Sequence, residues 1–250
     1  MSPTLRLSGK TALVTGAARR VGAQLVRALH AEGANCVIHC HRSLEQAEEM
    51  AAELNGARAG SAAVLSADLR DAATPARLVA QTCERFGGLD LLINNASTFY
   101  PTAFGSITVA QWQDLVGTNL QAPLFLAQAA AAPLRAARGA IINIVDIHGL
   151  RPLRDHSVYS AAKAGLIMLT RALARELAPE VRVNAVAPGA VLWPEAGLDP
   201  QRKERILEQT PLHRPGSPED IARAVLFFAI ESPFVTGQIL AVDGGRSIGW

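Results

Sequence analysis

Seven short apolar runs, separated by longer amphipathic stretches, constrain the fold of this chain more than any other feature. Each run is apolar almost throughout instead of at alternate positions, which is typical of strands covered on both faces. The runs cover residues 11–15, 35–41, 61–66, 89–94, 140–145, 181–186 and 239–243. Strands that alternate with helices are joined by right-handed crossovers and form parallel sheets. The sequence therefore predicts an α/β fold: a doubly wound, Rossmann-type sheet of seven parallel strands with helices on both faces.

The segments between the runs carry signals for the starts of helices. Residues 43–46 and 108–111 are capping-box patterns, in which a Ser or Thr is followed three residues later by Gln. Residues 217–220 place a proline at the first helical position and acidic residues in the first turn. We expect helices to begin at these three points, and long helices to cover residues 109–134 and 157–177.

The composition fits a globular protein and excludes several other classes. Of the 250 residues, 49% are hydrophobic and 18% are charged, which excludes an intrinsically disordered chain. The 24 basic and 22 acidic side chains give a net charge of +2 without a block of like charge, so neither a nucleic acid nor a membrane is expected as a partner. No apolar run reaches the roughly 20 residues that span a bilayer. The first ten residues lack the apolar segment of a secretory signal.

The three cysteines, Cys36, Cys40 and Cys83, indicate a reducing compartment, because an odd and sparse set does not form a disulfide framework. Cys36 and Cys40 lie four residues apart on one face of a predicted strand. No second pair of Cys or His stands at ligand spacing, so buried free thiols are favoured over a zinc site. We therefore expect a cytoplasmic protein without a metal.

No linker, repeat or shift in composition divides residues 1–250, which predicts a single domain. The segment 192–214 differs from the rest of the chain in composition, since it is rich in proline. It also interrupts the alternation of strands and helices just after a predicted strand. Ligands bind at the carboxyl ends of such strands. We interpret this segment as a substrate loop or lid, with an ordinary surface insertion as the alternative.

The first strand runs into a glycine-containing turn at residues 16–22, and a helix is expected to begin near Arg20. Such a turn lets backbone N–H groups and a helix N-terminus face a pyrophosphate. Arg20 stands where the middle glycine of this motif is usual, and its guanidinium could bind the phosphates. A turn with purely structural glycines is the alternative.

The end of the second strand, His41-Arg42-Ser43, bears on the choice between NAD and NADP. An NAD site places an acidic residue here to bind the ribose 2′-hydroxyl, and this chain has none. Arg42, His41 and Ser43 could bind a 2′-phosphate instead, which favours NADP(H). Ser43 also fits the N-cap of the next helix, and Arg42 could be an ordinary surface charge.

A set of ordered motifs over nearly the whole chain resembles the short-chain dehydrogenase/reductase family. Any one motif is weakly specific, whereas this order and spacing are very unlikely to arise by chance. The motifs are TGAARRVG at 15–22, AD at 67–68, NNAS at 94–97, an isolated Asn119, YSAAK at 159–163, APG at 187–189 and DGG at 243–245.

Within this family the chain is most similar to the pteridine reductases. Arg20 replaces a glycine of the nucleotide loop, and HCHRS at 39–43 follows the second strand, as in those enzymes. Asp146, thirteen residues before Tyr159, stands where most of the family has serine. The segment 94–104, which includes Phe99, is also similar to pteridine reductases.

Tyr159 and Lys163 lie four residues apart and so share one face of a predicted helix. A neighbouring ammonium would lower the pKa of the Tyr159 phenol toward the working range and make it a proton donor. Asp146 closes the fifth predicted strand; the resemblance implies that it partners Tyr159 in protonating a pterin ring nitrogen. A structural cap for the following turn is the alternative for Asp146, and a surface pair is the alternative for Tyr159 and Lys163.

The resemblance also implies roles for other residues. Phe99 would stack on a flat substrate, with a plain core phenylalanine as the alternative. Ser97 would contact cofactor and substrate, and Asn119 would support Lys163 through backbone or water. The expected catalytic residues are Asp146, Tyr159, Lys163 and Asn119. The expected substrate contacts are Ser97, Phe99, Asp146, Tyr159, Leu192 and Trp193. The expected cofactor contacts are Gly16, Arg20, Val21, His41, Arg42, Ser43, Asp68, Leu69, Asn95, Ala96, Ser97, Tyr159, Lys163, Pro188 and Gly189.

These features predict an NADPH-dependent pteridine reductase that transfers a hydride to a C=N bond of a dihydropterin of the dihydrobiopterin or dihydromonapterin type, with folate and dihydrofolate as further candidates. The alternatives are a carbonyl reductase of the oxoacyl or sugar type and an NADPH-binding regulatory protein without turnover.

The family usually forms homotetramers through two helices of each subunit, here 109–134 and 157–177. Trp250 is a candidate to reach a neighbouring active site. His148 and His156 are expected in surface loops at the rim of the site.

Overall fold

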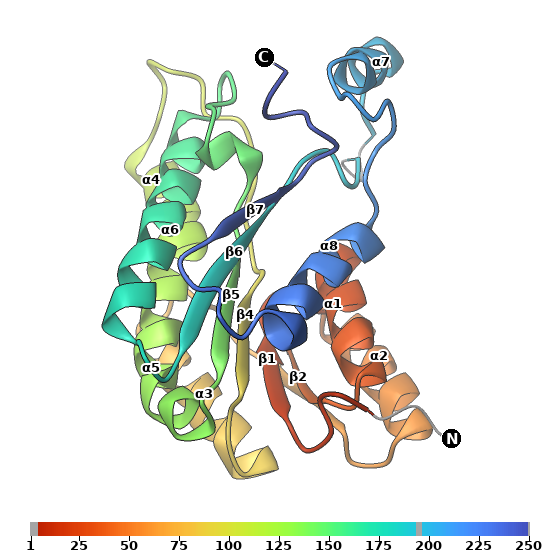
Figure 1. Ribbon diagram of the computed structural model, residues 1–250. Helices are drawn as coiled ribbons and strands as arrows, with labels where there is room; N and C mark the ends of the chain where they lie inside the picture. Colours follow the sequence, from red (N-terminus) through yellow and green to blue (C-terminus); the bar gives the residue numbers. More distant parts are fainter. Residues whose placement is uncertain (1–4, 194–196, 250) are drawn as a thin grey trace.

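The computed structural model describes residues 5–193 and 197–249, and a seven-stranded parallel sheet forms its centre (Figure 1). The strand order in space is β3-β2-β1-β4-β5-β6-β7. The predicted doubly wound fold is confirmed, and each strand lies within two residues of its predicted bounds. The strands are β1 (Thr11–Val14), β2 (Asn35–Cys40), β3 (Ala62–Ser66), β4 (Leu91–Asn94), β5 (Ala140–Ile144), β6 (Arg182–Pro188) and β7 (Ile239–Val242).

Helices cover both faces of the sheet, as Figure 1 shows. One layer contains α1 (Arg20–Ala31), α2 (Leu44–Ala57) and α8 (Pro218–Leu226). The other layer contains α3 (Thr74–Phe86), α4 (Val109–Val116), α5 (Ala122–Ala137) and α6 (Ser157–Glu176). Helix α7 (Pro200–Glu208) belongs to neither layer and stands beyond the carboxyl ends of the strands.

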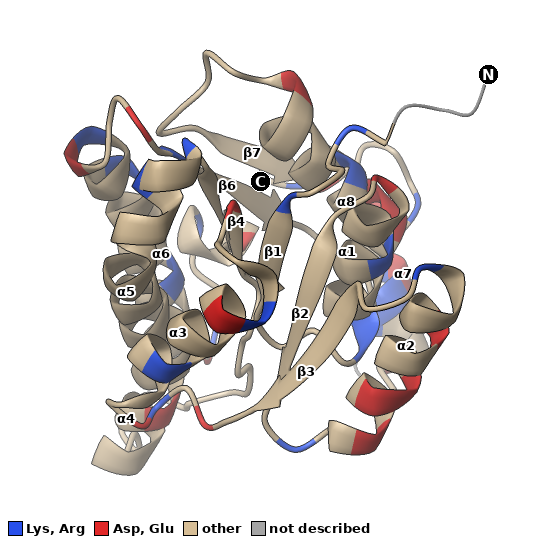
Figure 2. Cartoon of the chain, turned by 90° about the horizontal axis from the view of Figure 1, so that it is seen from below, with Lys and Arg blue, Asp and Glu red and all other residues tan. Residues whose placement is uncertain are grey.

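Consecutive strand residues point into different hydrophobic cores, which explains why the runs are apolar throughout. Val14 of β1 and Ile93 of β4 belong to the core under α1 and α8, whereas Leu13 and Leu92 belong to the core under α3 and α5. All four side chains are fully buried. Burial of one such side chain contributes about 1.5–3 kcal/mol to folding. Figure 2 shows the result, since the charged residues lie on the helices and loops around strands β1 to β3 and not within them.

The order in which strands are added to the sheet changes side between β1 and β4. After β1 the chain builds β2 and β3 on one side, and it then returns to pair β4 with the other edge of β1. The loops that leave β1 and β4 therefore diverge at the carboxyl edge of the sheet. Open α/β sheets bind their ligands at such a point.

Two of the three predicted helix caps form. Thr108 and Ser217 each accept a hydrogen bond from the backbone N–H three residues later, in reciprocal capping boxes with Gln111 and Asp220. Ser43 occupies the N-cap of α2 but makes no side-chain cap hydrogen bond, so the predicted capping box is wrong there. Its ψ is 54°, whereas Thr108 and Ser217 have the extended ψ values of 157° and 161° that direct the side chain back to the helix.

The helical stretch predicted over 109–134 contains a change of winding. A π-helical segment, η1 (Gly117–Gln121), joins α4 to α5, and α5 continues to Ala137. Short π segments inside α-helices occur often at functional sites.

Cys36 and Cys40 are buried free thiols, as predicted, and Cys83 is half-buried. Among the described residues, no helix combines the length and apolar character that a membrane crossing needs.

Candidate active site

Two adjoining cavities open at the carboxyl edge of the sheet. The first has a volume of about 760 Å³ and lies over the loops that leave β1, β2 and β3. The second has a volume of about 1090 Å³ and lies over the ends of β5 and β6, under α7. Arg19, Arg20 and Ser97 line both cavities. The two spaces are therefore neighbours in one cleft.

The turn after β1 is packed so tightly that only glycine fits at two positions. Gly16 has a φ of +59°, and a Cβ on it would lie 2.8 Å from the Cα of Ala96. A Cβ on Gly22 would collide with the carbonyl oxygen of Gly16. The Asn95 amide donates to the carbonyl oxygens of Thr15 and Gly16, both at 2.9 Å, and fixes the turn against the loop after β4. The turn and the first cavity together fit a dinucleotide, because the backbone can approach a pyrophosphate closely.

Most of the predicted cofactor contacts line the first cavity. Gly189 lines the second cavity, while Pro188 ends β6 and Lys163 is buried, and neither of these two lines a cavity. The predicted residues around the first cavity are Gly16, Arg20, Val21, His41, Arg42, Ser43, Asp68, Leu69, Asn95, Ala96 and Ser97.

Arg20 points differently from our expectation. Its guanidinium Nη2 donates to the backbone oxygens of Leu192 and Trp193, at 3.5 and 3.2 Å, in the segment after β6. Its φ of +55° lies in the left-handed region, where the usual glycine has no steric penalty. Arg20 therefore joins the nucleotide turn to the predicted substrate loop and lines both cavities.

His39 is a residue of the cleft that the sequence reasoning did not select. Its Nδ1 accepts from the backbone N–H of Gly16 at 3.2 Å, and its Nε2 donates to the carbonyl oxygen of Ala67 at 3.1 Å. Burial lowers the pKa of the imidazole to about 4, so the ring is neutral and has one defined tautomer. His39 thus links the turn after β1 to the loop after β3. The motif at 39–43 contained the signal, but its position within the strand suggested a core residue.

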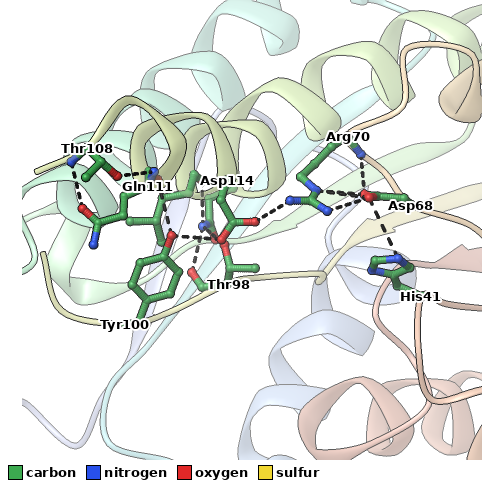
Figure 3. Close-up of polar contacts among 10 residues, drawn as sticks. His41, Asp68, Arg70, Thr98, Tyr100, Thr108, Gln111 and Asp114 are labelled. Atoms are coloured by element: carbon green, nitrogen blue, oxygen red, sulfur yellow. Dashed lines mark hydrogen bonds and ion pairs between the residues drawn. The ribbon is translucent and has the colours of Figure 1, made fainter.

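A polar network ties the loop after β3 to helix α4 at the floor of the first cavity (Figure 3). Arg70 donates to both oxygens of Asp68, at 3.0 and 2.7 Å, and to Asp114 at 2.9 Å. The hydrogen bonds from Arg70 lower the pKa of Asp68 to about 2. Tyr100 donates to Asp114 at 3.0 Å, and His41 lies 3.9 Å from Asp68. Asp68 is therefore held ionised beside the segment that was predicted to bind the cofactor.

Tyr159 and Asp146 form a direct hydrogen bond in the second cavity. The phenol donates to Oδ2 of Asp146 at 2.7 Å, and Oδ1 of Asp146 accepts from the backbone N–H of His148 at 2.8 Å. Asp146 both caps the turn after β5 and binds Tyr159, so the two interpretations of this residue hold together. The carboxylate is positioned to orient the phenol.

The predicted lowering of the Tyr159 pKa is wrong for this arrangement. Burial of the phenol and the adjacent Asp146 carboxylate raise its pKa well above the usual value. Lys163 donates to the carbonyl oxygen of Ile144 at 2.9 Å, and its Nζ lies 5.8 Å from the centre of the Tyr159 ring. Burial lowers the pKa of Lys163 to about 8. Burial is the largest cause, and the hydrogen-bonded Asp146 carboxylate acts in the same direction, so the pKa of Tyr159 rises.

Asn119 contacts Ser97, and its support of Lys163 through backbone or water stays a prediction. It lies in η1 and is fully buried; its Oδ1 accepts from the Ser97 hydroxyl at 2.7 Å. Its amide donates to the backbone oxygens of Thr98 and Leu115, both at 2.9 Å. The π segment thus aims Asn119 at the loop after β4, where it fixes a hydroxyl shared by the two cavities.

Phe99 and His156 form an aromatic wall in the second cavity. Their rings stack with centroids 4.7 Å apart, and Phe99 meets the Tyr159 ring edge-on at 4.8 Å. Phe99 is 51% exposed, so it is not a core residue, whereas His156 is buried. The expectation that His156 lies in a surface loop is wrong, because its ring is covered by Phe99 and its Nδ1 lies 2.8 Å from the Arg154 oxygen.

The segment 192–214 forms one side of the second cavity through Leu192, Trp193 and helix α7. Asp199 accepts from the backbone N–H of Arg202 and caps α7. All six predicted substrate contacts, namely Ser97, Phe99, Asp146, Tyr159, Leu192 and Trp193, line this cavity. The cleft therefore places a phenol, a carboxylate and an aromatic ring beside a dinucleotide-sized space.

The sheet order, the nucleotide turn and the Tyr159–Lys163 pair define a class of protein: this chain belongs to the short-chain dehydrogenase/reductase family and is an oxidoreductase. A family profile described as enoyl-(acyl carrier protein) reductase matches residues 16–247. This match covers β2 to β7 and the residues that line both cavities.

Relatives with similar sequence identity to this chain are enzymes with different activities. The chain is 35% identical to pteridine reductase 1 of Leishmania tarentolae, over 95% of this chain and 96% of the relative. It is 36% identical to 2,5-dichloro-2,5-cyclohexadiene-1,4-diol dehydrogenase LinX of Sphingobium indicum, over 98% of each chain. It is also 36% identical to 3-oxoacyl-(acyl-carrier-protein) reductase FabG of Staphylococcus aureus, over 94% of this chain and 97% of the relative. Overall identity thus shows the family but not the substrate.

Proposed function

We propose that this protein is an NADPH-dependent pteridine reductase, which adds a hydride to the carbon and a proton to the nitrogen of a C=N bond in a dihydropterin. The hydrogen bond of 2.7 Å between Tyr159 and Asp146 carries the proposal. A carboxylate at this position can accept hydrogen bonds from ring and amino N–H groups of a pterin while the phenol donates. The reacting part of an oxoacyl substrate has no such donors, so the carboxylate would be of little use to it. Similarity to a pteridine reductase supports the same choice.

The first cavity is assigned to NADPH, which supplies the hydride when it is bound. In this assignment the turn after β1 binds the pyrophosphate, and Asp68 and Leu69 lie along the adenine. His41, Arg42 and Ser43 bind the 2′-phosphate at the end of β2, where an acidic residue would repel it. Asn95, Ala96 and Val21 complete the lining, and Pro188 and Gly189 lie toward the nicotinamide.

Tyr159 is assigned as the proton donor. Its raised pKa keeps the phenol protonated at neutral pH, so the proton is present when the substrate binds. Asp146 orients the O–H, and Lys163 favours the phenolate that forms when the proton leaves. In this assignment Lys163 also holds the nicotinamide ribose. Asn119 is a positioning residue that acts through the Ser97 hydroxyl.

The flat ring of the substrate is assigned to the exposed face of Phe99. Since His156 stacks on the opposite face of Phe99, the aromatic wall has a fixed orientation. Stacking on a planar aromatic ring suits a bicyclic heterocycle better than a flexible acyl chain. Leu192 and Trp193 of the segment 192–214 close the other side, as a substrate loop.

Steady-state rates with NADPH test the substrate assignment. The panel contains 7,8-dihydrobiopterin, 7,8-dihydromonapterin, 7,8-dihydrofolate, folate and an acetoacetyl thioester. We expect turnover of pterins at rates well above that of the thioester. Activity confined to the thioester would establish the second candidate, a carbonyl reductase, which the similarity to FabG favours. Binding of NADPH without turnover of any compound would indicate the third, a regulatory protein.

The Arg42→Asp substitution tests the cofactor assignment. A carboxylate at this position removes a phosphate contact and adds repulsion, so the Kd of NADPH should rise at least ten-fold while that of NADH changes little. Fluorescence titration of both cofactors measures this difference. Equal losses of affinity would place the 2′-phosphate contact elsewhere.

A further inference from the structure

The second cavity holds an unusual share of the positive charge of the chain. Among the residues that the structure describes, six basic side chains line it, against three acidic side chains. The chain as a whole is nearly neutral, with a net charge of +2, so the excess is local. The lining arginines are Arg19, Arg20, Arg154, Arg202, Arg205 and Arg246, and the acidic residues are Asp146, Asp155 and Asp199.

The three aspartates already have partners that fix their positions. Asp146 binds Tyr159, Asp199 caps α7, and Asp155 lies 3.9 Å from Arg154. Within the described part of the chain, the guanidinium groups of Arg202 and Arg205 form no ion pair and no hydrogen bond. Both side chains are exposed at the cavity, so their charges are available to an anionic ligand.

Arg202 and Arg205 lie three residues apart on α7 and so project from one face of this helix. That face lines the second cavity together with Leu198 and Ile206. Helix α7 stands beyond the carboxyl ends of the strands, as Figure 1 shows, and its residues line the second cavity. Arg202 and Arg205 thus line the cavity from α7, while Phe99 lines it from the loop after β4 and Tyr159 from α6.

The size of the cavity leaves room for more than a bicyclic ring. Its volume of about 1090 Å³, part of which lies beside Gly189 and is assigned to the nicotinamide, is at the upper end of the roughly 300–1000 Å³ of most sites for drug-sized ligands. A cleft lined by charges of one sign also focuses the electric field and concentrates ligands of the opposite sign. Both features suit a substrate that has a ring at one end and several negative charges at the other.

We propose that the substrate carries a multiply anionic tail, made of carboxylates or phosphates, which Arg202, Arg205 and Arg154 bind in the second cavity while the ring lies on Phe99. The proposal rests on the proposed function and specifies its substrate class. Pterins with an uncharged side chain, such as dihydrobiopterin, would occupy the ring site alone. They are therefore poorer substrates than pterins with a charged tail.

Substrates that share the ring and differ in tail charge test this proposal. The series is 7,8-dihydrobiopterin, 7,8-dihydrofolate, its triglutamate and 7,8-dihydroneopterin triphosphate. We expect kcat/KM to rise with tail charge, by at least ten-fold over the series, and to fall with added salt for the charged compounds only. Comparison of the triglutamate with the triphosphate identifies which anionic group the site prefers.

The double substitution Arg202→Gln/Arg205→Gln locates the effect. It should raise KM about ten-fold for the charged compounds, with kcat unchanged, and leave both constants unchanged for dihydrobiopterin. Arg77→Gln/Arg85→Gln removes the same charge from the exposed surface of α3, away from both cavities and outside the two helical stretches expected at subunit interfaces, and serves as the control. Equal kcat/KM over the series, or equal losses with both double variants, would overturn the proposal.

Binding of folate triglutamate, measured by calorimetry, separates this proposal from the proposed function. If no pterin is reduced but the wild-type protein binds folate triglutamate at least ten-fold more tightly than the Arg202→Gln/Arg205→Gln variant, the tail site stands and the reductase assignment fails. If pterins are reduced but the two proteins bind folate triglutamate equally, the reductase assignment stands and the tail site fails.

Discussion

The Tyr159 phenol keeps its proton because its surroundings disfavour the charged form. Burial removes the water that would solvate a phenolate, and the Asp146 carboxylate at 2.7 Å repels it. The same carboxylate accepts the phenolic hydrogen and so orients the oxygen. A neutral phenol that is held in one orientation can act as a donor, whereas an ionised one cannot.

Replacement of Tyr159 by phenylalanine removes the proton donor and keeps the ring that packs against Phe99. We expect kcat for the reduction of a pterin to fall by about 10²–10⁴-fold, which is the usual contribution of general acid catalysis. The Kd for NADPH should change little, since the phenol lines the second cavity and not the first. Stopped-flow rates and cofactor titration measure the two quantities; unaffected turnover would exclude Tyr159 as the donor.

His39 couples the stability of the nucleotide turn to pH. Its pKa is about 4 in the folded chain and about 6.5 when exposed, so the unfolded state binds more protons between these values. The contribution is fully present above pH 6.5 and is lost as the pH falls toward 4. Between pH 7 and pH 4.5 the free energy of unfolding should decrease by about 2–3 kcal/mol from this residue alone.

The variant His39→Gln, which cannot titrate, isolates this effect. Urea unfolding at pH 7 and pH 4.5 gives the loss of stability for each protein. We expect the loss to be about 2–3 kcal/mol smaller in the variant. A loss of equal size in both proteins would show that His39 does not titrate with folding. The buried His30, whose pKa burial also lowers, remains in both proteins and cancels in the comparison.

At the level of elements, a Ser or Thr at the predicted start of a helix caps that helix in two cases and does not cap it in a third. Thr108 and Ser217 cap α4 and α8, and Ser43 does not cap α2, because only the first two have an extended backbone at the N-cap. We predict that Thr108→Ala and Ser217→Ala each lower the free energy of unfolding by about 1 kcal/mol, and Ser43→Ala by less than about 0.5 kcal/mol. Equilibrium denaturation of the three variants checks this. A comparable loss in Ser43→Ala would mean that its side chain caps α2 after all.

At the level of the whole molecule, the layer that contains α4, α5 and α6 exposes large apolar side chains. Trp112 is 50% exposed, Phe125 41% and Met168 60%. Exposed apolar surface of this kind marks interfaces between proteins. We propose that these helices pack against copies of the same chain in a homotetramer, the assembly that the family resemblance implies.

The double substitution Trp112→Glu/Phe125→Glu should dissociate this assembly, because it places charges in a surface that the tetramer buries. Sedimentation equilibrium should show a species of four times 26.4 kDa for the wild type and a smaller one for the variant. Leu44→Glu, at a comparably exposed residue of α2 in the other layer, is the control and should remain a tetramer. A wild-type protein of 26.4 kDa would contradict the assembly.

Trp250 lies outside the described residues, and its contact with a neighbouring site stays a prediction.

Sequence patterns predicted most of the fold because they report local and repeated physics. A strand buried on both faces must be apolar throughout, and this requirement appears in every one of the seven runs. The site residues were predicted from motifs, and the cleft brings most of them together: Gly16 to Ser43 around one cavity, and Ser97 to Trp193 around the other. Arg70, Arg202 and Arg205 were not predicted, since an arginine in a helix or loop is usually a solvated charge.

The sequence by itself determined the order of the elements, and it predicted the cofactor turn and the reacting groups, because each of these appears as a motif of residues that are close together in the chain. Only the tertiary structure decided how distant groups act on one another. It set the direction of the Tyr159 pKa, the stacking of His156 on Phe99 and the turning of Arg20 toward Leu192. Electrostatic and packing energies depend on distances in space, and separation along the chain does not give those distances.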